Sequence, residues 1–547
     1  MRQAYGSGFS HEFETSLPGY YRVLLQDENI QAELTASERC GVHRYTYPAG
    51  SDRKLVIDLL HGARGSCTIV KEDNKAIVHD SFIRQVDEYT IEGYRVSSSW
   101  AKYQHAYFSA KFSEPISEVK IFSQDKEVQT DSLHCTRLKA ILDFGVADRP
   151  LEIKVGISPV SMEGARSNLK TELGDSGFNE VCAQAVQKWE KQLSKFQIQT
   201  DDEDLRTIFY TCLHNVFLYP MLYSDVDGKF RGPDHEVHQA DGFDYYAGVL
   251  GLWDNFRAAN PLLTIANPGI ANEQIQTFLA HYDICGLLPI WTLAGHETLT
   301  MIGYHAMPVI ADAYYKGVRD YDADAVFEAM KASANKDEFG LSMRRMMGTK
   351  NYKKYGYIPA DVEFESVAQT LEFAYDDWCI AQMAKMLGRD EDYETFMERS
   401  KSYRHVIDPE TKFARGRMTD GSWRTPFDPR ASTHRRDDYC EGTAWQWTFF
   451  VPHDPAGLAD IMGGKAELEK KLDGLLAASS ETTGGKSSGA ISGLIGQYAH
   501  GNEPSHHVAY LYNFTGAPWK TQSMVDQIFR EMYANNPDGV CGNDDTG

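Results

Sequence analysis

The sequence contains no run of about 18 apolar residues, the length that a membrane-spanning helix requires. Its first residues, MRQAYGSGFSHEFETSLPGYYRV, include no apolar segment of the signal-peptide type. It has nine cysteines but no CxxC pair, which excludes zinc ribbons and thioredoxin-type redox motifs. Their wide, irregular spacing predicts buried free thiols and no dense disulfide framework.

Basic residues are also in short supply. Lys and Arg number 55 against 78 Asp and Glu, and the formal charge is −23. A chain this acidic is a poor candidate for binding nucleic acid or an anionic membrane surface. Hydrophobic residues make up 42% of the chain, enough for sizeable cores. Aromatic residues make up 12%, which fits large cores and also flat surfaces that stack on sugar rings.

The first part of the chain has the period of β-strands. Its short runs alternate apolar and polar residues and are separated by Gly, Pro, Asp and Ser at intervals of roughly ten residues. Examples are YYRVLLQ, IQAELTAS, HRYTYP, KLVIDLL, SCTIVKE, DEYTIEGYRV, AYFSAKFS, EVKIFS, LKAILDF and LEIKVGIS. This spacing predicts an all-β sandwich.

From about Ser161 the apolar residues recur at helical spacing. Clear examples are SMEGARSNLKTEL, NEVCAQAVQKWEKQLSKF, DLRTIFYTCLHNVFLY, AMPVIADAYYKGV, SVAQTLEFAYDDWCIAQMAKML and MVDQIFREMYANN. We therefore predict a β-domain over 1–160, a helical linker over 161–200 and a large all-α domain over 201–547. Long loops separate these helices, and function concentrates in such loops.

The loop GLWDNFR combines Trp253, Asp254 and Arg257. The face of a pyranose stacks on an indole, while carboxylate and guanidinium groups bond its hydroxyls. The alternative is a helix start, with Asp254 as its cap and Trp253 in the core.

The loop YCEGTAWQW places Glu441 between apolar and aromatic residues. Such surroundings favour the protonated form of a carboxyl group, which a general acid needs. An ordinary capping or ion-paired glutamate is the alternative.

The loop HGNEPSHH surrounds Glu503 with three histidines and Asn502. It has no HExxH pattern, so a zinc site is disfavoured. Carboxylate, amide and carbonyl oxygens suit calcium, and Glu503 is a candidate ligand of substrate or of a hard cation. A structural loop with an exposed glutamate is the alternative.

The sequence ends in GNDDTG, where Asp544 and Asp545 follow Asn543. An exposed acidic turn is the simple interpretation, and a DxDxDG calcium loop does not fit. Glycosidases, however, need two separated carboxyl groups, one protonated and one ionised. Glu441 and Asp545 could form such a pair.

Taken together, these segments resemble glycoside hydrolase family 92, the calcium-dependent exo-α-mannosidases. The matching stretches are GLWDNFRAANPLLT, GYHAMPVIADAYYKG, GYIPADVEFESVAQTLEFAYDDWCIAQMAK, YCEGTAWQWTFFVPHD, HGNEPSHHVAYLYNFTGAPWKTQ and GNDDTG, with SHEFETSLPGYYRV and GYRVSSSWAKYQHAYFSAKFSEP in the β part. The resemblance spans nearly the whole chain. It implies an N-terminal β-sandwich followed by an (α/α)6 toroid, and the removal of terminal α-mannose with inversion.

The resemblance also implies roles for individual residues. Glu441 matches the general acid and Asp545 the general base. Asp254 and Arg257, beside Trp253, match sugar-binding positions. Asn502 and Glu503 match substrate-binding positions, and Glu503 is the candidate calcium ligand.

Two departures from the family pattern bear on these roles. Asn543 stands where many members have an acid, which favours Asp545 as the base. Asn502 stands where members specific for α-1,2 linkages can carry histidine. The family's N-terminal Gly- and His-rich stretch and its last helices have no counterpart in this sequence, which is therefore expected to be incomplete at both ends.

The expected partner is a mannose-containing oligosaccharide or glycoprotein glycan, with α-1,2-linked mannose as the first expectation. The resemblance implies a secreted, periplasmic or surface-attached location. Two other classes stay open. One is another (α/α)6 carbohydrate-active enzyme, such as a phosphorylase or lyase, and the other is a glycan-binding protein without catalysis.

Overall fold

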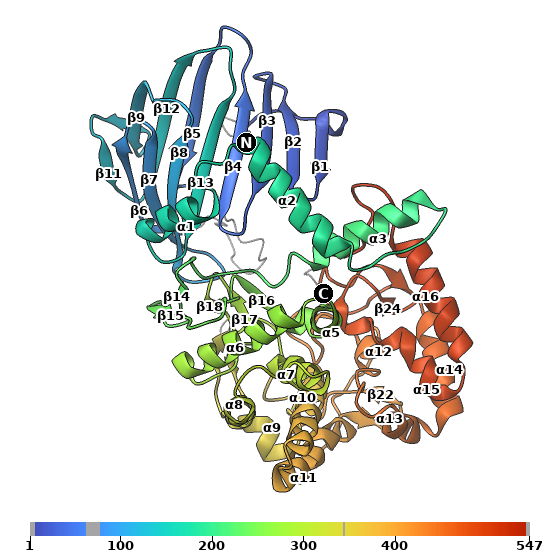
Figure 1. The fold of residues 1–547 in the computed structure, drawn as a ribbon. Helices are drawn as coiled ribbons and strands as arrows, with labels where there is room; N and C mark the ends of the chain where they lie inside the picture. Colours follow the sequence, from blue (N-terminus) through green and yellow to red (C-terminus); the bar gives the residue numbers. More distant parts are fainter. Residues whose placement is uncertain (1–5, 62–76, 343–344, 543–547) are drawn as a thin grey trace. The chain divides into compact units, whose positions relative to one another are not determined.

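The computed structural model describes residues 6–61, 77–342 and 345–542 (Figure 1). The chain forms two compact units. The first unit comprises Met1–Gln197, Pro220–Val249 and Thr292–Glu297. The second comprises Ile198–Tyr219, Leu250–Trp291 and Thr298–Gly547. The first unit thus contains the long strands, the two helices after them, and two segments that come later in the chain.

The long strands of the first unit form two antiparallel sheets. Among the described residues, the larger sheet has nine strands, in the order β1 (Glu14–Leu17), β2 (Tyr20–Leu25), β3 (Ile30–Ala36), β4 (Cys40–Thr46), β13 (Leu151–Ser158), β8 (Gln104–Phe112), β7 (Thr90–Ser98), β6 (Ile77–Asp87) and β11 (Ser132–His134). The smaller has β10 (Lys126–Val128), β9 (Glu118–Ser123), β12 (Leu138–Val146) and β5 (Asp52–Asp58). The predicted strand SCTIVKE falls within 62–76, outside the described residues.

One hydrophobic core joins side chains of both sheets. Along β12 every second residue is buried, because successive side chains of a strand point to opposite faces. These residues pack with apolar side chains of the larger sheet. The cluster includes Leu138, Ala140, Leu142 and Phe144 from β12, and Ile83, Ile91, Phe112 and Ile153 from the larger sheet. The alternation read from the sequence therefore produces the packed faces of a sandwich.

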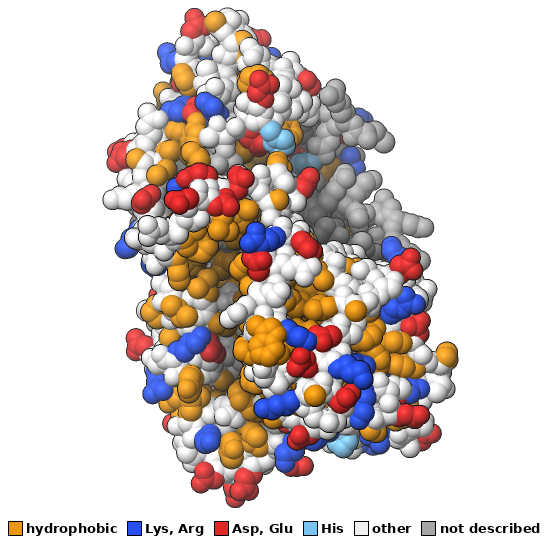
Figure 2. Space-filling view, turned by 90° about the vertical axis from the view of Figure 1, so that its right-hand side faces the viewer, with side chains coloured by type: hydrophobic (Ala, Val, Ile, Leu, Met, Phe, Trp, Pro, Cys, Tyr) orange, Lys and Arg blue, Asp and Glu red, His pale blue; other side chains and the backbone are white. Residues whose placement is uncertain are grey.

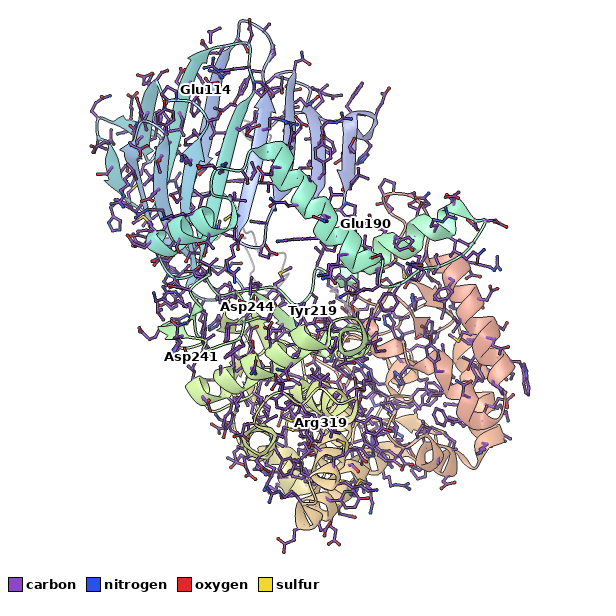
Figure 3. All side chains as sticks on the ribbon, in the orientation of Figure 1. Glu114, Glu190, Tyr219, Asp241, Asp244 and Arg319 are labelled. Atoms are coloured by element: carbon purple, nitrogen blue, oxygen red, sulfur yellow. The ribbon has the colours of Figure 1, made fainter. Side chains whose placement is uncertain are left out.

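A buried ion pair accompanies this core. Arg53 is 1% exposed, and its Nη1 and Nη2 donate to the two carboxylate oxygens of Glu114 at 3.0 and 2.6 Å. Figure 3 shows Glu114 among the strands of this unit. The bidentate bond to Arg53 lowers the pKa of Glu114 to about 2.

The helices α1 (Met162–Glu172) and α2 (Phe178–Leu193) pack on the larger sheet. Ser161 caps α1 by accepting a hydrogen bond from the backbone N–H of Gly164. Leu169 and Phe178 bury their side chains against Val42 of β4. The apolar stripe of each helix therefore covers the sheet face away from the sandwich core.

Several short elements belong to the first unit or lie where the chain passes between the two units. They are the 3₁₀ helix η1 (His11–Phe13) and the strands β14 (Lys229–Arg231), β15 (Val237–Gln239), β16 (Val249–Gly251), β17 (Trp291–Leu293) and β18 (His296–Glu297). Their two or three residues are too few to give the alternating pattern by which the long strands are recognised.

The second unit is built from helices. Its described helices are α3 (Glu203–Val216), α4 (Leu252–Asn255), α5 (Ala259–Ala266), α6 (Pro268–Cys285), α7 (Ala306–Tyr315), α8 (Ala323–Asn335), α9 (Lys350–Tyr355), α10 (Ser366–Met386), α11 (Asp390–Arg399), α12 (Ala444–Trp447), α13 (Pro455–Met462), α14 (Lys465–Ala477), α15 (Tyr512–Thr515) and α16 (Pro518–Met532). Between them lie η2 (Ser400–His405), η3 (Glu503–Ser505), η4 (Val508–Leu511), β19 (Gly340–Ser342), β20 (Arg345–Met347), β21 (Ile407–Asp408), β22 (Phe413–Ala414), β23 (Leu494–Ile495) and β24 (Tyr498–Ala499).

Helix α10 is buried on all sides and packs against α7, α8 and α11. A helix in this position is expected to be apolar all round. Instead, Glu372, Asp376 and Asp377 are all fully buried within it. Carboxylates in such surroundings need charged or hydrogen-bonding partners, because the desolvation of an unpaired charge is very costly.

The surface carries both charge signs. Figure 2 shows acidic and basic side chains interspersed with apolar ones on the face that it displays. Within the described part of the chain, no helix combines the length and the apolar character that crossing a membrane would require.

Candidate active site

Glu441 lies on a loop whose backbone is fixed from two directions. The carbonyl oxygen of the preceding residue, Cys440, accepts a hydrogen bond of 2.8 Å from Trp447 Nε1. The carbonyl oxygen of Glu441 itself accepts one of 2.9 Å from Asn502 Nδ2. The φ angle of Glu441 is +45°, in the left-handed region. Non-glycine residues held in this region cluster at functional sites, because the surrounding structure must offset a strain on the order of 1–3 kcal/mol.

The residues that follow Glu441 lock this loop in place. A Cβ atom at Gly442 would lie 2.7 Å from Trp447 Nε1, so the glycine permits the close approach of the indole. Thr443 caps α12, and its backbone N–H donates to Gln446 Oε1 at 2.5 Å. Gln446 Nε2 in turn donates to the carbonyl oxygen of Gln497 at 2.8 Å. The EGTAWQ motif is therefore a capped helix start that presents Glu441 just ahead of it.

Two further charged residues near this loop have left-handed backbones. Glu365 has φ +55° and Arg435 has φ +58°. Burial raises the pKa of the Cys440 thiol well above its usual range, and the negative charges of Glu365 and Glu441 raise it further. Cys440 is therefore an inert, protonated thiol next to a group of carboxylates. Glu365 and Arg435 could not be recognised from the sequence, because the type of a residue does not indicate that its backbone is strained.

The start of α10 is tied to the segment that leads to Glu441. The backbone N–H of Glu365 donates to the carbonyl oxygen of Asp437 at 2.6 Å. Ser366 Oγ donates to Asp438 Oδ1 at 2.9 Å. Asp438 also pairs with Arg424, at 3.1 Å. These bonds link the buried helix to the loop that carries the predicted acid.

Arg257 is held among aromatic rings. Its guanidinium carbon lies 5.0, 4.5 and 5.1 Å from the ring centroids of Trp253, Phe256 and Phe450. Its Nε donates to the carbonyl oxygen of Trp253 at 3.0 Å, and its Nη2 donates to Glu372 Oε1 at 3.1 Å. Trp253 is only 1% exposed, so its ring packs against Arg257, and its stacking on a sugar stays a prediction.

Asp254 is the third residue of α4 and not its cap, because the helix begins at Leu252. Its side chain is buried, and Oδ2 accepts a hydrogen bond of 3.1 Å from Trp291 Nε1. A Cβ atom at Gly251 would lie 2.6 Å from the same oxygen. Glycine at 251 therefore makes room for the carboxylate, and Trp291 is a partner that the sequence did not reveal.

Asn502 and Glu503 lie at the start of η3, followed by Pro504 in its first turn. Both side chains are buried, at 3% and 4% exposure. Because Asn502 bonds the backbone of Glu441, the structure brings two of the predicted site residues together across 61 positions of the sequence. Because Glu503 is buried, the alternative of a structural loop with an exposed glutamate is wrong.

The three histidines of this loop bond within the protein. His500 shares hydrogen bonds of 2.9 Å with the hydroxyls of Tyr498 and Tyr533. His506 Nε2 bonds the carbonyl oxygen of His500 at 3.0 Å, and His507 Nε2 bonds a backbone carbonyl at 2.8 Å. Burial lowers the pKa values of His500 and His507 to about 4. These histidines are therefore neutral at pH 7 and serve to build the loop.

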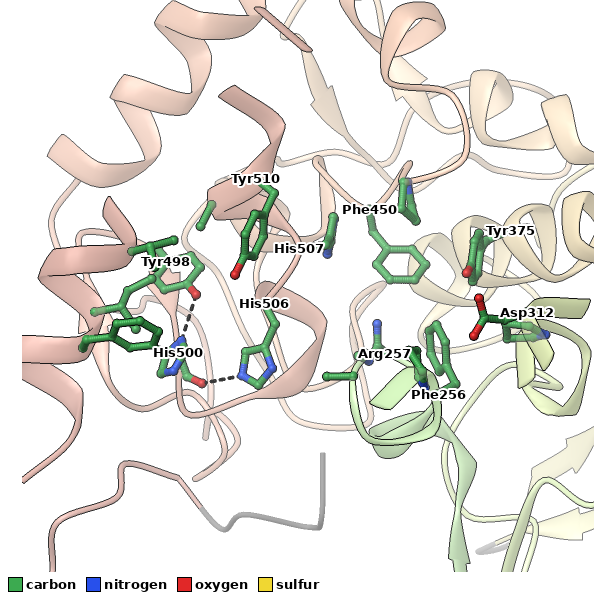
Figure 4. Close-up of a pocket in the computed structure, with 18 of the residues that line it drawn as sticks. Phe256, Arg257, Asp312, Tyr375, Phe450, Tyr498, His500, His506, His507 and Tyr510 are labelled. Carbon is green, nitrogen blue, oxygen red and sulfur yellow. Dashed lines mark hydrogen bonds between the residues drawn. The ribbon is translucent and has the colours of Figure 1, made fainter. Parts of the chain in front are cut away.

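Two cavities border these residues in the second unit. The larger, of about 540 Å³, is lined by Arg257, by the histidines 500, 506 and 507, and by several aromatic rings (Figure 4). The smaller, of about 130 Å³, is lined by Glu503 and Asn215. His500, His506 and Tyr533 line both. Glu441 and Asp254 line neither of these two cavities.

A calcium ion takes about six to eight oxygen ligands. Within the described ranges, no three or more His, Cys, Asp or Glu side chains gather in a group that could hold a metal ion. Glu503 offers one buried carboxylate, and the amide of Asn215 lines the same small cavity. The described side chains thus supply part of an oxygen ligand set, and the role of Glu503 as a ligand stays a prediction.

The predicted base lies in the last residues of the chain. Asp545 and Asn543 fall outside the described residues. The role of Asp545, and the distance of its carboxyl group from that of Glu441, therefore stay predictions.

Comparison with known families decides the identity of the chain. The model of the glycosyl hydrolase family 92 catalytic domain matches residues 164–547, and that of the family's N-terminal domain matches residues 1–158. The chain belongs to glycosyl hydrolase family 92. The predicted resemblance is thereby confirmed, and with it the class of glycoside hydrolases.

Solved family 92 structures from Bacteroides thetaiotaomicron resemble this chain closely. An α-mannosidase of the family, solved in complex with mannoimidazole, is 38% identical with a TM-score of 0.91, covering 99% of this chain and 70% of that one. An inverting mannosidase of the family is 28% identical with a TM-score of 0.85, covering 99% and 72%. The predicted fold class, a β-sandwich followed by an (α/α)6 toroid, is confirmed by this family 92 likeness.

A curated relative from Arthroderma benhamiae is named an uncharacterized secreted glycosidase. It is 22% identical over 582 residues, which cover 97% of this chain and 67% of the relative. At this level of identity, and with no described activity, it adds only that a chain similar to this one is named a secreted glycosidase.

Proposed function

We propose that this family 92 chain removes terminal, non-reducing α-linked mannose from oligosaccharides or glycoprotein glycans. The reaction breaks the bond between the anomeric carbon and the glycosidic oxygen. A water oxygen forms the new bond to that carbon from the opposite face, so that the configuration is inverted. The names of the family 92 structures, an α-mannosidase and an inverting mannosidase, support this substrate and this outcome.

The observation that carries the proposal is the fixed position of Glu441. Its backbone is in the left-handed region, and its carbonyl oxygen is held by Asn502. A buried Cys440 precedes it, and the packed pair Gly442 and Trp447 follows it. An ordinary capping glutamate needs none of these constraints. A general acid does, because it must stay within hydrogen-bond reach of the leaving oxygen.

Glu441 donates a proton to the glycosidic oxygen as the bond to the anomeric carbon breaks. Asp545 accepts a proton from the attacking water. In inverting glycosidases the two carboxyl groups stand about 6.5–9.5 Å apart, which leaves room for that water. The family pattern favours Asp545 over its neighbours as the base, since the chain has an amide at Asn543.

The remaining site residues bind the sugar. Arg257 and Asp254 bond hydroxyls of the terminal mannose, and Trp253 packs against Arg257 and supports it. Asn502 and Glu503 bond the mannose and the residue next to it. The α-1,2 linkage is the first to test. Other linkages are tested as well, because Asn502 stands where α-1,2-specific members can carry histidine.

Calcium is part of the proposal through family membership. When bound, the ion polarises sugar hydroxyls and fixes the ring, and Glu503 is the residue of this chain that would contact it. A secreted, periplasmic or surface location fits an enzyme whose substrates are extracellular glycans. The name of the Arthroderma benhamiae relative supports that location.

The test is the release of mannose from α-1,2-, α-1,3-, α-1,4- and α-1,6-linked mannobioses, measured by chromatography. Release from at least one of them, with calcium present, is expected. The β-linked mannobiose and an α-linked glucobiose serve as controls. Cleavage of a control at a comparable rate, or of no α-mannobiose at all, contradicts the proposal.

A further inference from the structure

A row of four buried charged side chains leads away from Arg257 into α10. Arg257 Nη2 donates to Glu372 Oε1 at 3.1 Å. His305 Nε2 bonds the other oxygen of Glu372 at 3.1 Å, and His305 Nδ1 bonds Asp376 Oδ1 at 2.8 Å. The side chains of Glu372, His305 and Asp376 are 0%, 1% and 0% exposed. The row therefore runs through the interior, and its Arg257 end reaches the larger cavity.

Basic and acidic side chains alternate along this row. Burial by itself would lower the pKa of His305, but Asp376 and Glu372 raise it to about 9. The raised pKa favours the imidazolium form of His305 at pH 7, where it lies between the two carboxyl groups. Alternation removes the cost of an unpaired buried charge, and each ion is further held by hydrogen bonds.

The packing around His305 fixes the row sterically. The imidazole stacks on the ring of Phe256 with centroids 4.3 Å apart and an interplanar angle of 18°. A Cβ atom at Gly303 would lie 2.1 Å from His305 Nε2, so only glycine fits there, and its φ is +82°. The backbone N–H of Tyr304 donates to the second oxygen of Asp376 at 2.9 Å. Each group of the row thus has one orientation.

Glu372 occupies one edge of the Arg257 guanidinium, while the aromatic rings of Phe256 and Phe450 hold its plane. Figure 4 shows Arg257 close to both rings at the cavity. An arginine has five N–H donors in a rigid plane. Two of them bond Trp253 and Glu372, and Arg257 also lines the larger cavity.

We infer that Glu372 and His305 are positioning residues for catalysis: they fix Arg257 so that its remaining N–H groups meet the mannose hydroxyls in one geometry. The inference rests on the proposed function, because it takes Arg257 as a sugar-binding residue. It assigns to the fully buried carboxylate of α10 a role in substrate binding that acts only through Arg257.

The same helix offers a matched control for a purely structural role. Asp377 follows Asp376 directly and is equally buried. It pairs with Arg399 at 3.0 Å and accepts hydrogen bonds from the hydroxyls of Tyr304 and Tyr352. None of these partners is Arg257. Loss of the Asp377 charge therefore disturbs the interior but removes none of the bonds among Arg257, Glu372 and His305.

The experiment is a double-mutant cycle between Glu372→Gln and Arg257→Lys. Wild type, both single variants and the double variant are compared by kcat and KM on 4-nitrophenyl α-mannoside, with Tm recorded for each. Glu372→Gln is expected to lower kcat/KM at least tenfold, chiefly through KM. The double variant is expected to be no worse than Arg257→Lys alone, because the glutamate acts through the arginine.

Asp377→Asn is expected to lower the Tm but to keep kcat/KM within twofold of wild type. In combination with Arg257→Lys, its small change in kcat/KM should add to the loss that Arg257→Lys causes. Additive losses for Glu372→Gln and Arg257→Lys overturn the inference, as does a Glu372→Gln enzyme with unchanged KM. If Glu372→Gln does not fold, His305→Gln tests the next link, with the same non-additivity expected. If the wild-type chain cleaves no α-mannoside, the proposed function fails. That result is distinct from a failure of this inference, which requires an active wild type.

Discussion

At the scale of single residues, the strongest chemical assignment is Glu441. Replacement by glutamine keeps the shape of the side chain but removes the transferable proton. We expect kcat on an α-mannobiose to fall by about 10²–10⁴-fold, the usual contribution of general acid catalysis. The binding of mannose, measured by calorimetry, should stay detectable because the sugar-binding groups are unchanged.

The leaving group gives this test its control. A 4-nitrophenolate leaves without protonation, so Glu441→Gln should lose much less activity on 4-nitrophenyl α-mannoside than on the mannobiose. Glu481→Gln, at an exposed position, should behave as wild type on both. An equal loss on both substrates, or none on either, contradicts the role of Glu441 as the acid.

The raised pKa of Asp437 leads us to expect that the stability of the protein depends on pH. Burial raises its pKa to about 7, although backbone N–H groups of Thr433 and Tyr439 lower it in part. The pKa of an unfolded aspartate is about 3.9. Because the folded pKa is the higher, the contribution of Asp437 to stability is fully present below about pH 3.9 and is lost as pH rises through 7.

The variant Asp437→Asn lacks this titration. Its Tm relative to wild type is expected to become more favourable as pH rises from 5 to 8, as measured by thermal denaturation. The exposed variant Asp420→Asn should show no such trend, because hydrogen bonds from Ser422 lower the pKa of Asp420 and keep its titration below this pH range. A Tm difference for Asp437→Asn that is constant or reversed between these pH values would argue against a raised pKa.

The residues of the candidate site could be named from sequence, but the contacts between them could not. Loop motifs pointed to Glu441, Asn502 and Arg257, because acids, amides and aromatics crowd there. Nothing local to the motif indicated that Asn502 holds the backbone of Glu441, since the two are 61 positions apart. Glu372 could have been found from the four-residue spacing of carboxylates in an otherwise apolar helix, which requires buried partners.

At the scale of elements, the capped start of α12 should matter as much as the acid. Gly442→Ala places a Cβ atom 2.7 Å from Trp447 Nε1, and the loop must shift to relieve the clash. A displacement on the order of 1 Å can cost about 10²-fold in rate. We expect kcat to fall by at least about tenfold while circular dichroism shows an intact helical fold.

Gly269→Ala is the matched control for this variant. Gly269 lies in the first turn of α6, and nothing would contact its Cβ atom within 4 Å. Its kcat should equal that of wild type. Its Tm should equal or exceed that of wild type, because alanine favours helices. A Gly442→Ala enzyme with wild-type kcat would mean that the position of Glu441 does not depend on this packing.

The long elements were predictable from sequence. Strands such as β12 and β13 show period-two alternation because one face packs into the sandwich. Helices α3, α7, α10 and α16 appear where helical spacing indicated them. The short strands β14 to β24 escaped prediction, since two or three residues carry no period. The return of Pro220–Val249 and Thr292–Glu297 to the first unit could not be foreseen either, because it depends on tertiary contacts.

At the scale of the whole molecule, the carboxylates behind the net charge of −23 lie in two kinds of surroundings. Many lie on the surface with cations interspersed. A few are buried in α10 and its surroundings, where Glu372 and Asp377 each have a positive partner. The excess of acidic residues that argues against nucleic-acid binding therefore also includes the carboxylates of the proposed site.

The proposed calcium dependence is tested on the whole enzyme. Treatment with EDTA is expected to abolish mannose release, and added calcium is expected to restore it, because carboxylate and amide oxygens prefer hard cations. Zinc should not restore it, since the histidines of the HGNEPSHH loop bond within the protein. Full activity in EDTA, or recovery with zinc alone, contradicts the calcium proposal.

The configuration of the released sugar tests most directly the proposal that this chain is an inverting α-mannosidase. Proton NMR of the anomeric signals during the first minutes of hydrolysis reads that configuration before mutarotation mixes the anomers. We expect β-mannose to accumulate first from an α-mannoside. Initial release of α-mannose, or no release of mannose, would contradict the assignment.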